Sequence, residues 1–368
     1  MHILIAPDSF KESLSAFEVA TAIREGFQKA IPAATFDILP VGDGGEGTLD
    51  ALVDGLKLNR DSHIVTGAFG NPVSAQYARK DNLAVFEMAS ICGLEKIPID
   101  KRDPLTLTTK GVGEMIVYLV KQGVTEIMLG VGGSATNDGG IGMAEGLGYE
   151  FFDKLGNSVK AVGENLDKMA SFSDGNLHVN LNQVTIKIIS DVKNPLCGSD
   201  GATYVFAGQK GLESDKFAFV DKMMREFYQK ISVPLLTMEG AGAGGGMAAG
   251  LVYFANGQIV SGIDAVLDAL DFDHRVKSAD LVIIGEGRMD NQSLSGKAPI
   301  GVSRRTPKGI PIVAICGSLK NDLPDFPFEN IQAAFPIIAT VDSLENTLAF
   351  AKENVIRTAN NIGNLLLL

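Results

Sequence analysis

Short apolar strands that run into glycine-rich turns recur along this chain, and they constrain its fold more than any other feature. Three such turns are Gly42–Thr48, Gly132–Gly140 and Gly285–Arg288. Glycine accounts for 42 of the 368 residues, about 11% where about 7% is usual. Helix-like segments also recur, and the one that starts at Ser15–Glu18 has the form of a capping box. Strands that alternate with helices in this way predict an α/β fold with largely parallel sheets.

The length of the chain and the course of its pattern predict two domains. A single core stops growing near about 250–300 residues, and this chain has 368. The regular pattern is lost around residues 57–76 and returns after Asp280, so we expect one domain to be inserted into the other. The expected division is a discontinuous α/β domain of the Rossmann or flavodoxin-like kind, residues 1–65 and 285–368, and an inserted α/β domain, residues 66–284.

Charge and composition exclude several classes of protein. The chain has 32 Lys and Arg against 44 Asp and Glu, a formal net charge of −12. Such a surface repels nucleic acid and anionic membranes, so neither is an expected partner. The apolar start of the chain is too short and lacks the basic residues of a signal peptide, which predicts a cytoplasmic location. Three separated cysteines without a CxxC pair exclude a disulfide framework and a cysteine-zinc site.

The turn Gly132–Gly140 is the strongest candidate for binding a phosphate group. Glycines let a backbone approach an anion closely, and the N–H groups at the start of a helix point towards it. Ser134 and Thr136 add hydroxyl donors. The alternative is a tight turn from strand to helix in which Asn137 or Asp138 caps the helix.

Two other glycine patterns are weaker signals for a nucleotide. Gly240-x-Gly242-x-x-Gly245 formally matches the dinucleotide fingerprint, but it lies late in the chain and does not open a βαβ unit. The segment nearest to a Walker A loop has Asn291 where the first glycine belongs and Ala298 where the hydroxyl residue belongs. If the chain uses ATP, it is therefore not a P-loop enzyme.

Charged side chains gather at or just beyond the ends of the expected strands. They are Asp8, Lys11, Asp43, Glu46, Asp138, Asp191, Glu286, Arg288 and Asp290. Ligands of open parallel sheets bind at this edge. Carboxylates there hold Mg²⁺, bind a hydroxyl group or accept a proton, whereas Lys and Arg bind phosphate or carboxylate groups. Helix capping by the acids and solvation of Lys11 are the alternatives, but Arg288 beside a Gly-x-Gly turn has little packing reason to be there.

Five segments in order along the chain resemble the bacterial type-1 glycerate kinase family. They are Ala6–Ala16, Gly42–Thr48, Gly132–Gly140, Ser190–Gly198 and Gly285–Asp290. The resemblance runs from Ile3 to past Gly317, essentially the whole chain. Glu12 stands where many members have glycine and Gly42 where many have alanine, and neither change removes a charged group from the expected site.

The resemblance implies ATP-dependent phosphorylation of D-glycerate with Mg²⁺, usually on the 2-hydroxyl, in a cleft between two α/β domains. The residue roles that follow are expectations: Lys11 or Arg288 holds the carboxylate of glycerate, and Asp191 accepts the hydroxyl proton, with Asp43 as the alternative. The full set is catalytic Asp191, Lys11, Arg288 and Asp43; substrate-binding Asp8, Ser9, Lys11 and Arg288; nucleotide-binding Gly132, Gly133, Ser134, Ala135, Thr136 and Asn137; and Mg²⁺-binding Asp43 and Asp290.

Two functions of other classes stay open at this point. A metal-dependent hydrolase of small phosphorylated acids would use the same carboxylates on water, and it would release phosphate without ATP. A non-catalytic binding protein for small anions would need donors, and the many loop carboxylates speak against it. The sequence leaves open the oligomeric state, a homo-oligomer included, the choice between the 2- and 3-hydroxyl, and the nucleotide preference.

Overall fold

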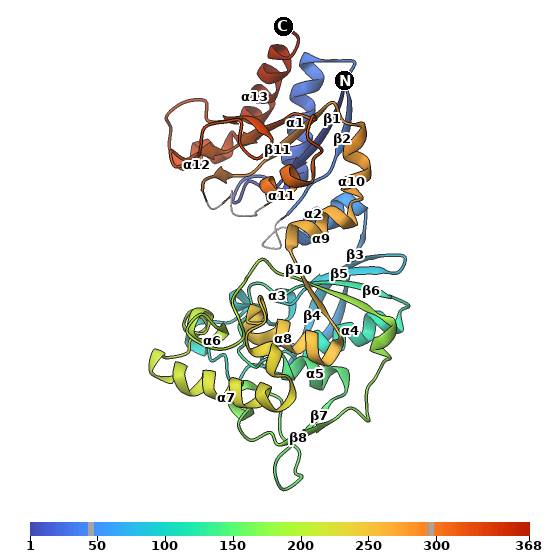
Figure 1. Ribbon diagram of the computed structural model, residues 1–368, viewed down its shortest axis with the longest axis vertical. Helices are drawn as coiled ribbons and strands as arrows, with labels where there is room; N and C mark the ends of the chain where they lie inside the picture. Colours follow the sequence, from blue (N-terminus) through green and yellow to red (C-terminus); the bar gives the residue numbers. More distant parts are fainter. Residues whose placement is uncertain (43–47, 292, 294–297) are drawn as a thin grey trace. The chain divides into compact units, whose positions relative to one another are not determined.

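The chain divides into two compact units, each with its own sheet (Figure 1). The computed structural model describes residues 1–42, 48–291, 293 and 298–368. Unit 1 consists of Met1–Leu58 and Ser261–Leu368, and unit 2 consists of Asn59–Val260. Both units mix helices with sheets whose strands are largely parallel, so the predicted fold class is confirmed.

The sheet of unit 1 has five strands, and all neighbouring strands run parallel. In the order of the sheet the strands are β15 (Ile331–Pro336), β13 (Ile312–Cys316), β11 (Leu281–Gly285), β1 (His2–Pro7) and β2 (Thr35–Ile38). Ile3, Ile5 and Ile283 share a buried cluster with the inward faces of α1 (Ala16–Ala30) and α13 (Ala351–Leu365). Leu4 and Val282 alternate with them and are also fully buried, so both faces of the sheet are covered.

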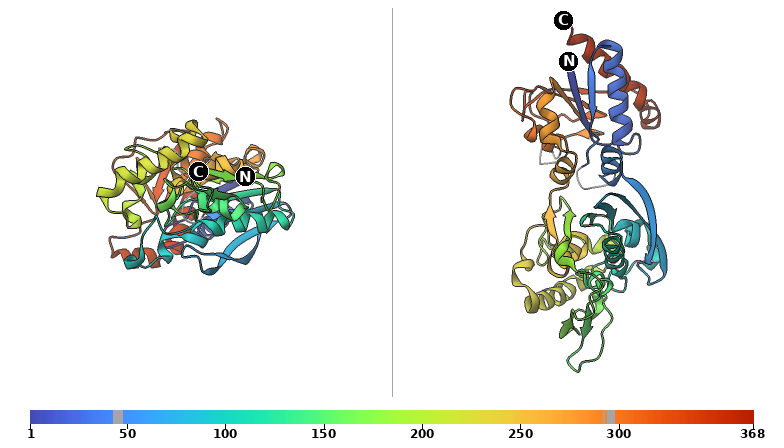
Figure 2. Two further views of the ribbon diagram at one scale, coloured as in Figure 1. Left: turned by 90° about the horizontal axis from the view of Figure 1, so that it is seen from below. Right: turned by 90° about the vertical axis from the view of Figure 1, so that its right-hand side faces the viewer.

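The helix α1 begins and packs as its sequence predicts. The Ser15 hydroxyl accepts the N–H of Glu18, and the Glu18 carboxylate accepts the N–H of Ser15, which confirms the capping box. Along its length α1 lies beside α13 (Figure 2). Gly26 permits this contact, because a Cβ atom there would lie 2.4 Å from the carbonyl oxygen of Ile356.

The predicted domain boundaries differ from the limits of the two units. Residues 261–284 belong to unit 1, because β11 pairs with β1 from Ile3 to Pro7 and cannot lie in an inserted domain. Residues 59–65 belong to unit 2, because β3 (Asn59–Thr66) pairs along its whole length with β4 (Pro72–Lys80).

The sheet of unit 2 has six strands in the order β10-β9-β6-β5-β4-β3. Besides β3 and β4, these are β5 (Leu83–Glu87), β6 (Glu126–Gly130), β9 (Thr185–Ile189) and β10 (Gln258–Val260). The strands β5, β6, β9 and β10 run parallel to one another, whereas β3, β4 and β5 form an antiparallel meander. The carboxyl ends of β5, β6 and β9 therefore meet at one edge.

The remaining elements connect these strands. In unit 1 they are α2 (Thr48–Leu56), α9 (Gly262–Ala269), α10 (Phe272–Arg275), η8 (Val276–Ser278), β12 (Arg288–Met289), α11 (Ala298–Arg305), β14 (Ser318–Leu319) and α12 (Leu344–Ala349). In unit 2 they are α3 (Ala89–Cys92), η1 (Leu94–Lys96), η2 (Ile99–Lys101), α4 (Lys110–Lys121), α5 (Ile141–Leu147), β7 (Glu150–Phe152), η3 (Gly163–Asn165), β8 (Ser171–Ser173), η4 (Leu181–Gln183), α6 (Ala202–Phe206), η5 (Gly208–Lys210), η6 (Ser214–Lys216), α7 (Phe217–Ile231), η7 (Val233–Leu236) and α8 (Ala243–Ala255). Within the described part of the chain, no helix has both the length and the apolar character to cross a membrane.

Candidate active site

In unit 1 the charged loops follow the ends of β1 and β11. Pro7 and Gly285 are partners in the last register position of the two strands, and the N–H of Asp8 donates to the carbonyl oxygen of Gly285 at 2.8 Å. Asp8 and Glu286 therefore leave the sheet side by side. Sequence reasoning placed both at this edge, and the pairing of the strands is what brings them together.

The loop after β1 is tightly closed and presents Lys11. Phe10 and Leu14 exchange two main-chain hydrogen bonds, of 2.8 and 2.9 Å. The Phe10 side chain is buried beneath the loop, whereas Lys11 is exposed. Ser9 is half-buried, and its N–H donates to the carboxylate of Asp8 at 2.6 Å.

The turn before Arg288 lies directly against the Lys11 loop. A Cβ atom on Gly287 would be 3.3 Å from the Cα of Phe10 and 3.4 Å from the main-chain nitrogen of Lys11. Arg288 is exposed and begins β12, which pairs with β14. The two predicted cations therefore come from loops in contact, and glycine at 287 leaves the room for that close contact.

The predicted metal ligands are only partly described. Asp290 has a largely buried carboxylate whose Oδ1 accepts the N–H of Ser293 at 3.2 Å, and its Oδ2 lies 3.6 Å from the Nζ of Lys320. Asp43, the second predicted ligand, lies outside the described residues, as does Glu46. Among the described side chains, no group of three or more His, Cys, Asp or Glu is placed to hold a metal ion.

In unit 2 three loops follow the carboxyl ends of β5, β6 and β9. Glu87, Gly130 and Ile189 are partners across these strands, so the segments after them start together. Asp191 follows β9 by two residues and is exposed. Glu87 is half-buried and its Cγ would lie 3.2 Å from a Cβ on Gly130. Sequence reasoning missed Glu87, although the apolar run before it carries the same signal as the other strand ends.

The glycine turn after β6 is exposed only at its first two residues. Gly132 and Gly133 are open to solvent, whereas the residues from Ser134 to Asn137 are buried. The N–H of Ala135 donates to the carbonyl oxygen of Cys92, and the N–H of Asn137 donates to that of Pro104, both at 2.9 Å. These two predicted phosphate donors are engaged inside unit 2, and the accessible surface of the turn is Gly132–Gly133.

The carboxylate of Asp138 binds N–H groups at the start of α5, the helix that follows this turn. Its carboxylate accepts the N–H groups of Gly140 and Gly142, at 3.0 and 3.3 Å, and the hydroxyl of Thr109 at 2.6 Å. Burial raises the pKa of this carboxyl above its usual value, and these hydrogen bonds oppose the rise. The N-cap residue of α5 is Gly140 and not Asn137 or Asp138, although the Asp138 carboxylate binds the N–H groups at the start of the helix.

A buried lysine, Lys210, also donates hydrogen bonds to this turn. The Nζ of Lys210 donates to the hydroxyl of Ser134 at 2.7 Å and to the carbonyl oxygen of Thr136 at 2.8 Å. The Lys210 side chain is 3% exposed, and burial lowers its pKa to about 8. Its sequence neighbourhood contains no signal for this role, because the contact joins segments far apart in the chain.

The Gly240–Gly246 segment packs against the turn instead of opening a βαβ unit. Gly244, Gly245 and Gly246 have φ values of +67°, +72° and +84°, which favour glycine. A Cβ on Gly245 would lie 2.1 Å from the carbonyl oxygen of Thr136, and the Gly245 carbonyl accepts the N–H of Gly139 at 3.0 Å. This segment is therefore a packing partner of the phosphate-binding candidate.

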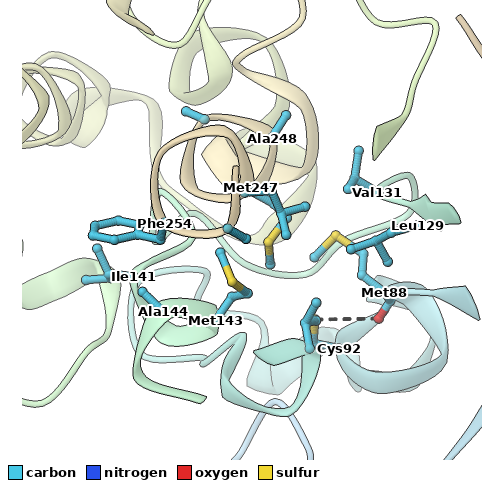
Figure 3. Close-up of a cluster of buried hydrophobic side chains, with 14 of the residues drawn as sticks. Met88, Cys92, Leu129, Val131, Ile141, Met143, Ala144, Met247, Ala248 and Phe254 are labelled. Carbon is cyan, nitrogen blue, oxygen red and sulfur yellow. Dashed lines mark hydrogen bonds between the residues drawn. The ribbon is translucent and has the colours of Figure 1, made fainter. Parts of the chain in front are cut away.

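An apolar core lies directly under these loops. Figure 3 shows Met88, Val131, Met143 and Met247, which come from the segments after β5 and β6, from α5 and from α8. The thiol of Cys92 lies in the same core and donates to the carbonyl oxygen of Met88 at 3.6 Å. The loops after β5 and β6 in unit 2 thus pack on one shared hydrophobic core.

Comparisons with known proteins agree over the whole chain. The model of the glycerate kinase family matches residues 3–367. A protein from Neisseria meningitidis serogroup B named glycerate kinase is 54% identical, and the match covers 100% of this chain and 99% of that protein. A protein from Escherichia coli K12 named glycerate 2-kinase is 39% identical and is matched over 98% of this chain and 97% of its own.

A solved structure has the same fold. It is a crystal structure of a protein provisionally named glycerate kinase 2 from Salmonella typhimurium LT2, with a TM-score of 0.90 and 41% identity. The match covers 100% of this chain and 98% of that one. By its sequence, its fold and the motifs at its strand ends, this chain belongs to the glycerate kinase family.

Proposed function

We propose that this enzyme transfers the γ-phosphoryl group of ATP to the 2-hydroxyl of D-glycerate, together with Mg²⁺, and releases 2-phosphoglycerate and ADP. The main support for glycerate as the acceptor is the contact between the Lys11 loop and the turn before Arg288. This contact places two exposed cations on neighbouring loops, where they can bind a small carboxylate. The name of the relative from Escherichia coli, glycerate 2-kinase, supports the choice of hydroxyl.

Lys11 and Arg288 are proposed to hold the carboxylate of glycerate. Charge-assisted hydrogen bonds to a carboxylate are about twice as strong as neutral ones, and an Arg can make two of them in parallel. Asp8 and Ser9 lie in the same loop as Lys11, and their carboxylate and hydroxyl groups suit the hydroxyl groups of the substrate. This arrangement recognises an anion that also carries hydroxyl groups.

The exposed pair Gly132–Gly133 is proposed to bind the phosphates of ATP. Without Cβ atoms, the two residues let a phosphate approach the main chain, and Gly133 has a φ of +67°. Ser134, Ala135, Thr136 and Asn137 then serve as the rigid base of this surface, because they are buried and hydrogen-bonded within unit 2. Of the six residues predicted to bind the nucleotide, only Gly132 and Gly133 are therefore proposed to contact its phosphates.

Asp191 is proposed to accept the proton of the 2-hydroxyl. The hydroxyl oxygen bonds to the γ-phosphorus, the bond from that phosphorus to the bridging oxygen of ADP breaks, and the proton passes to the carboxylate. Asp191 is exposed at a strand end, where a substrate can reach it. Asp43 is the alternative acceptor and lies outside the described residues.

Asp290 and Asp43 are the residues proposed to hold Mg²⁺, because carboxylate oxygens are hard ligands of the kind that this ion prefers. Lys320 lies 3.6 Å from Asp290 Oδ2, so the lysine and the ion would share this carboxylate. When bound, Mg²⁺ neutralises negative charge on the phosphates of ATP.

Turnover of ATP with and without glycerate tests this proposal. ADP formation should require D-glycerate and should match the phosphoglycerate formed one to one. L-glycerate and the 2-hydroxy acid lactate serve as controls for the handedness and for the second hydroxyl. Phosphate release that is independent of ATP would instead favour the hydrolase, and binding of glycerate without turnover would favour the anion-binding protein.

A further inference from the structure

We propose that Lys210 is a positioning residue for ATP, whose buried ammonium holds the turn after β6 in the conformation that binds the nucleotide phosphates. This inference rests on the proposed function, in which the exposed pair Gly132–Gly133 contacts those phosphates. It assigns a role to a residue that lies outside every sequence motif of the site. Lys210 touches neither substrate and acts through the turn.

The geometry links the lysine to the turn at two points. The Nζ of Lys210 donates to the hydroxyl of Ser134 and to the carbonyl oxygen of Thr136, at 2.7 and 2.8 Å. Ser134 directly follows the exposed glycine pair. Its side chain and that of Thr136 are 5% and 0% exposed, so water does not compete for these bonds. Lys210 is therefore the side chain that fixes Ser134 and Thr136 to each other, alongside the main-chain bonds of Gly133 to Leu94 and of Ala135 to Cys92.

The setting of Lys210 argues against a role in ordinary packing. Lysine is almost never fully buried unless its charge is paired, because burying a charge is costly. Here the two hydrogen bonds go to a hydroxyl and a main-chain carbonyl. The titratable groups that face the ammonium are Cys92 on α3 and Asp138 at the base of the turn.

Neither of these two groups neutralises the lysine at close range. Burial raises the pKa of Cys92 to about 12, so its thiol stays neutral at physiological pH. The carboxylate of Asp138 is used by the N–H groups of α5 and by Thr109. The close partners of the Lys210 ammonium are thus the two oxygen atoms of the turn, on Ser134 and Thr136.

The segment that carries Lys210 is anchored independently of the turn. Lys210 ends η5, and the next residue, Gly211, has a φ of +100°. A Cβ at Gly211 would lie 2.3 Å from the carbonyl oxygen of Arg102, so the chain passes close to a second segment here. The ammonium is therefore delivered from a fixed backbone, which a positioning residue requires.

The protonation of Lys210 gives a signature that a purely structural residue lacks. Burial lowers the pKa of Lys210 to about 8 from 10.5. Above pH 8 the neutral amine binds both acceptors less strongly, so the affinity for ATP should fall. Between pH 8 and 10.5 the unfolded chain binds the proton and the folded chain does not, so this group makes the free energy of unfolding rise with pH. Loss of affinity for ATP without loss of stability identifies the positioning role.

The test compares Lys210→Met with the wild-type enzyme and with Leu181→Ala. Leu181 is buried in η4 before β9, at the end of the strand away from the site loops, so its truncation is a control for lost stability alone. Steady-state kinetics give the KM values for ATP and D-glycerate, thermal melts give Tm, and both are repeated from pH 7 to 10. Loss of hydrogen bonds to a charged group predicts a KM for ATP raised about tenfold to a hundredfold in Lys210→Met.

Three further results are expected of Lys210→Met. Its KM for D-glycerate should stay within about twofold of the wild-type value, because the glycerate-binding cations are in unit 1. Its KM for ATP should no longer change across pH 8, whereas that of the wild type should rise. Leu181→Ala should lower Tm and leave both KM values unchanged.

Several results would overturn this inference. They are a KM for ATP in Lys210→Met equal to that of the wild type, a KM for glycerate that rises instead, or a wild-type KM for ATP that is flat from pH 7 to 10. If Lys210→Met does not fold, the KM for ATP of Lys210→Gln and of the wild type from pH 7 to 10 tests the inference instead. Failure of the proposed function is distinct: the wild type itself would not phosphorylate glycerate with ATP, and then both proposals fall.

Discussion

The N–H of Asp8 donates a hydrogen bond of 2.8 Å to the carbonyl oxygen of Gly285, which joins the ends of two strands from opposite ends of the sequence. Just beyond this bond, Gly287 lies against the main chain of Phe10 and Lys11. The two loops that carry the proposed glycerate-binding cations are therefore held in register by the sheet. The proposed binding of glycerate by Lys11 and Arg288 depends on this junction.

Removing either cation should weaken recognition of glycerate. Lys11→Ala and Arg288→Ala should each lower kcat/KM for D-glycerate about tenfold to a hundredfold, because each removes a charge-assisted bond of about 1.5–3 kcal/mol. Both side chains are exposed, so Tm should not change. Lys29→Ala is the matched control, since Lys29 is an exposed lysine of the same unit that pairs with Glu25. Near wild-type kinetics in both variants would remove Lys11 and Arg288 from the site.

Asp191→Asn should lower kcat and leave the KM for glycerate nearly unchanged. A group that accepts the hydroxyl proton acts mainly in the transition state, whereas a group that only binds substrate affects both states alike. General-base catalysis contributes about 10²–10⁴-fold, and the late proton transfer of a loose phosphoryl-transfer transition state favours the lower end. Kinetics at saturating D-glycerate measure the effect.

The control for this variant is Asp215→Asn, which changes another exposed aspartate of unit 2. It should retain wild-type kcat and Tm. If Asp191→Asn lost Tm and kept its kcat, Asp191 would be a structural residue of the loop after β9.

Gly245→Ala should disturb the turn after β6, and Gly123→Ala should not. Both glycines have positive φ values, +72° and +87°, so alanine costs about 1–2 kcal/mol at either position. Gly123 has open space at its Cβ position, whereas a Cβ on Gly245 would lie 2.1 Å from the carbonyl oxygen of Thr136. Overpacking adds about 1–3 kcal/mol at Gly245.

The two variants separate backbone strain from contact with the turn. Denaturant unfolding should show the larger loss of stability for Gly245→Ala, and only this variant should raise the KM for ATP. An equal loss of stability in both variants, with unchanged KM values, would mean that the glycine segment does not support the turn.

Glu12→Gly should stabilise the enzyme. Glu12 has a φ of +62°, in the left-handed region that costs a residue with a Cβ about 1–2 kcal/mol. Glycine avoids that cost but loses about 0.5–1 kcal/mol of chain entropy, so a net gain of up to about 1.5 kcal/mol is expected. This geometry explains why glycine suits the position. Glu25→Gly, in the interior of α1, should have the opposite sign, and urea unfolding of the two variants compares them.

Local patterns in the sequence carry much of the fold. The Ser15–Glu18 capping box depends on residues within one turn of helix, and its hydrogen bonds form as the pattern predicts. The α/β class likewise follows from alternation of strands and helices along the chain. The boundary before residue 285 was wrong for β11 because the partner of this strand, β1, is at the other end of the sequence. Strand pairing of that kind leaves no local signal.

The sequence predicted which charged residues follow the ends of strands. Asp8 and Asp191 follow β1 and β9 as predicted, Arg288 lies just beyond β11, and the same rule applied to Leu83–Glu87 selects Glu87; their roles in the proposed site stay predictions. The burial of Ser134 and Thr136 was not predictable, because a glycine-rich turn normally faces solvent. Their burial comes from Lys210 and the Gly244–Gly246 segment, which approach only in the folded chain.

The most direct test of the account is the ³¹P NMR spectrum of the product formed from ATP, Mg²⁺ and D-glycerate. The coupling of phosphorus to the protons of the carbon that bears it distinguishes a phosphate on the 2-hydroxyl, with one such proton, from one on the 3-hydroxyl, with two. We expect 2-phosphoglycerate and ADP to accumulate in equal amounts. A spectrum with only ADP and inorganic phosphate, or with 3-phosphoglycerate, would contradict it.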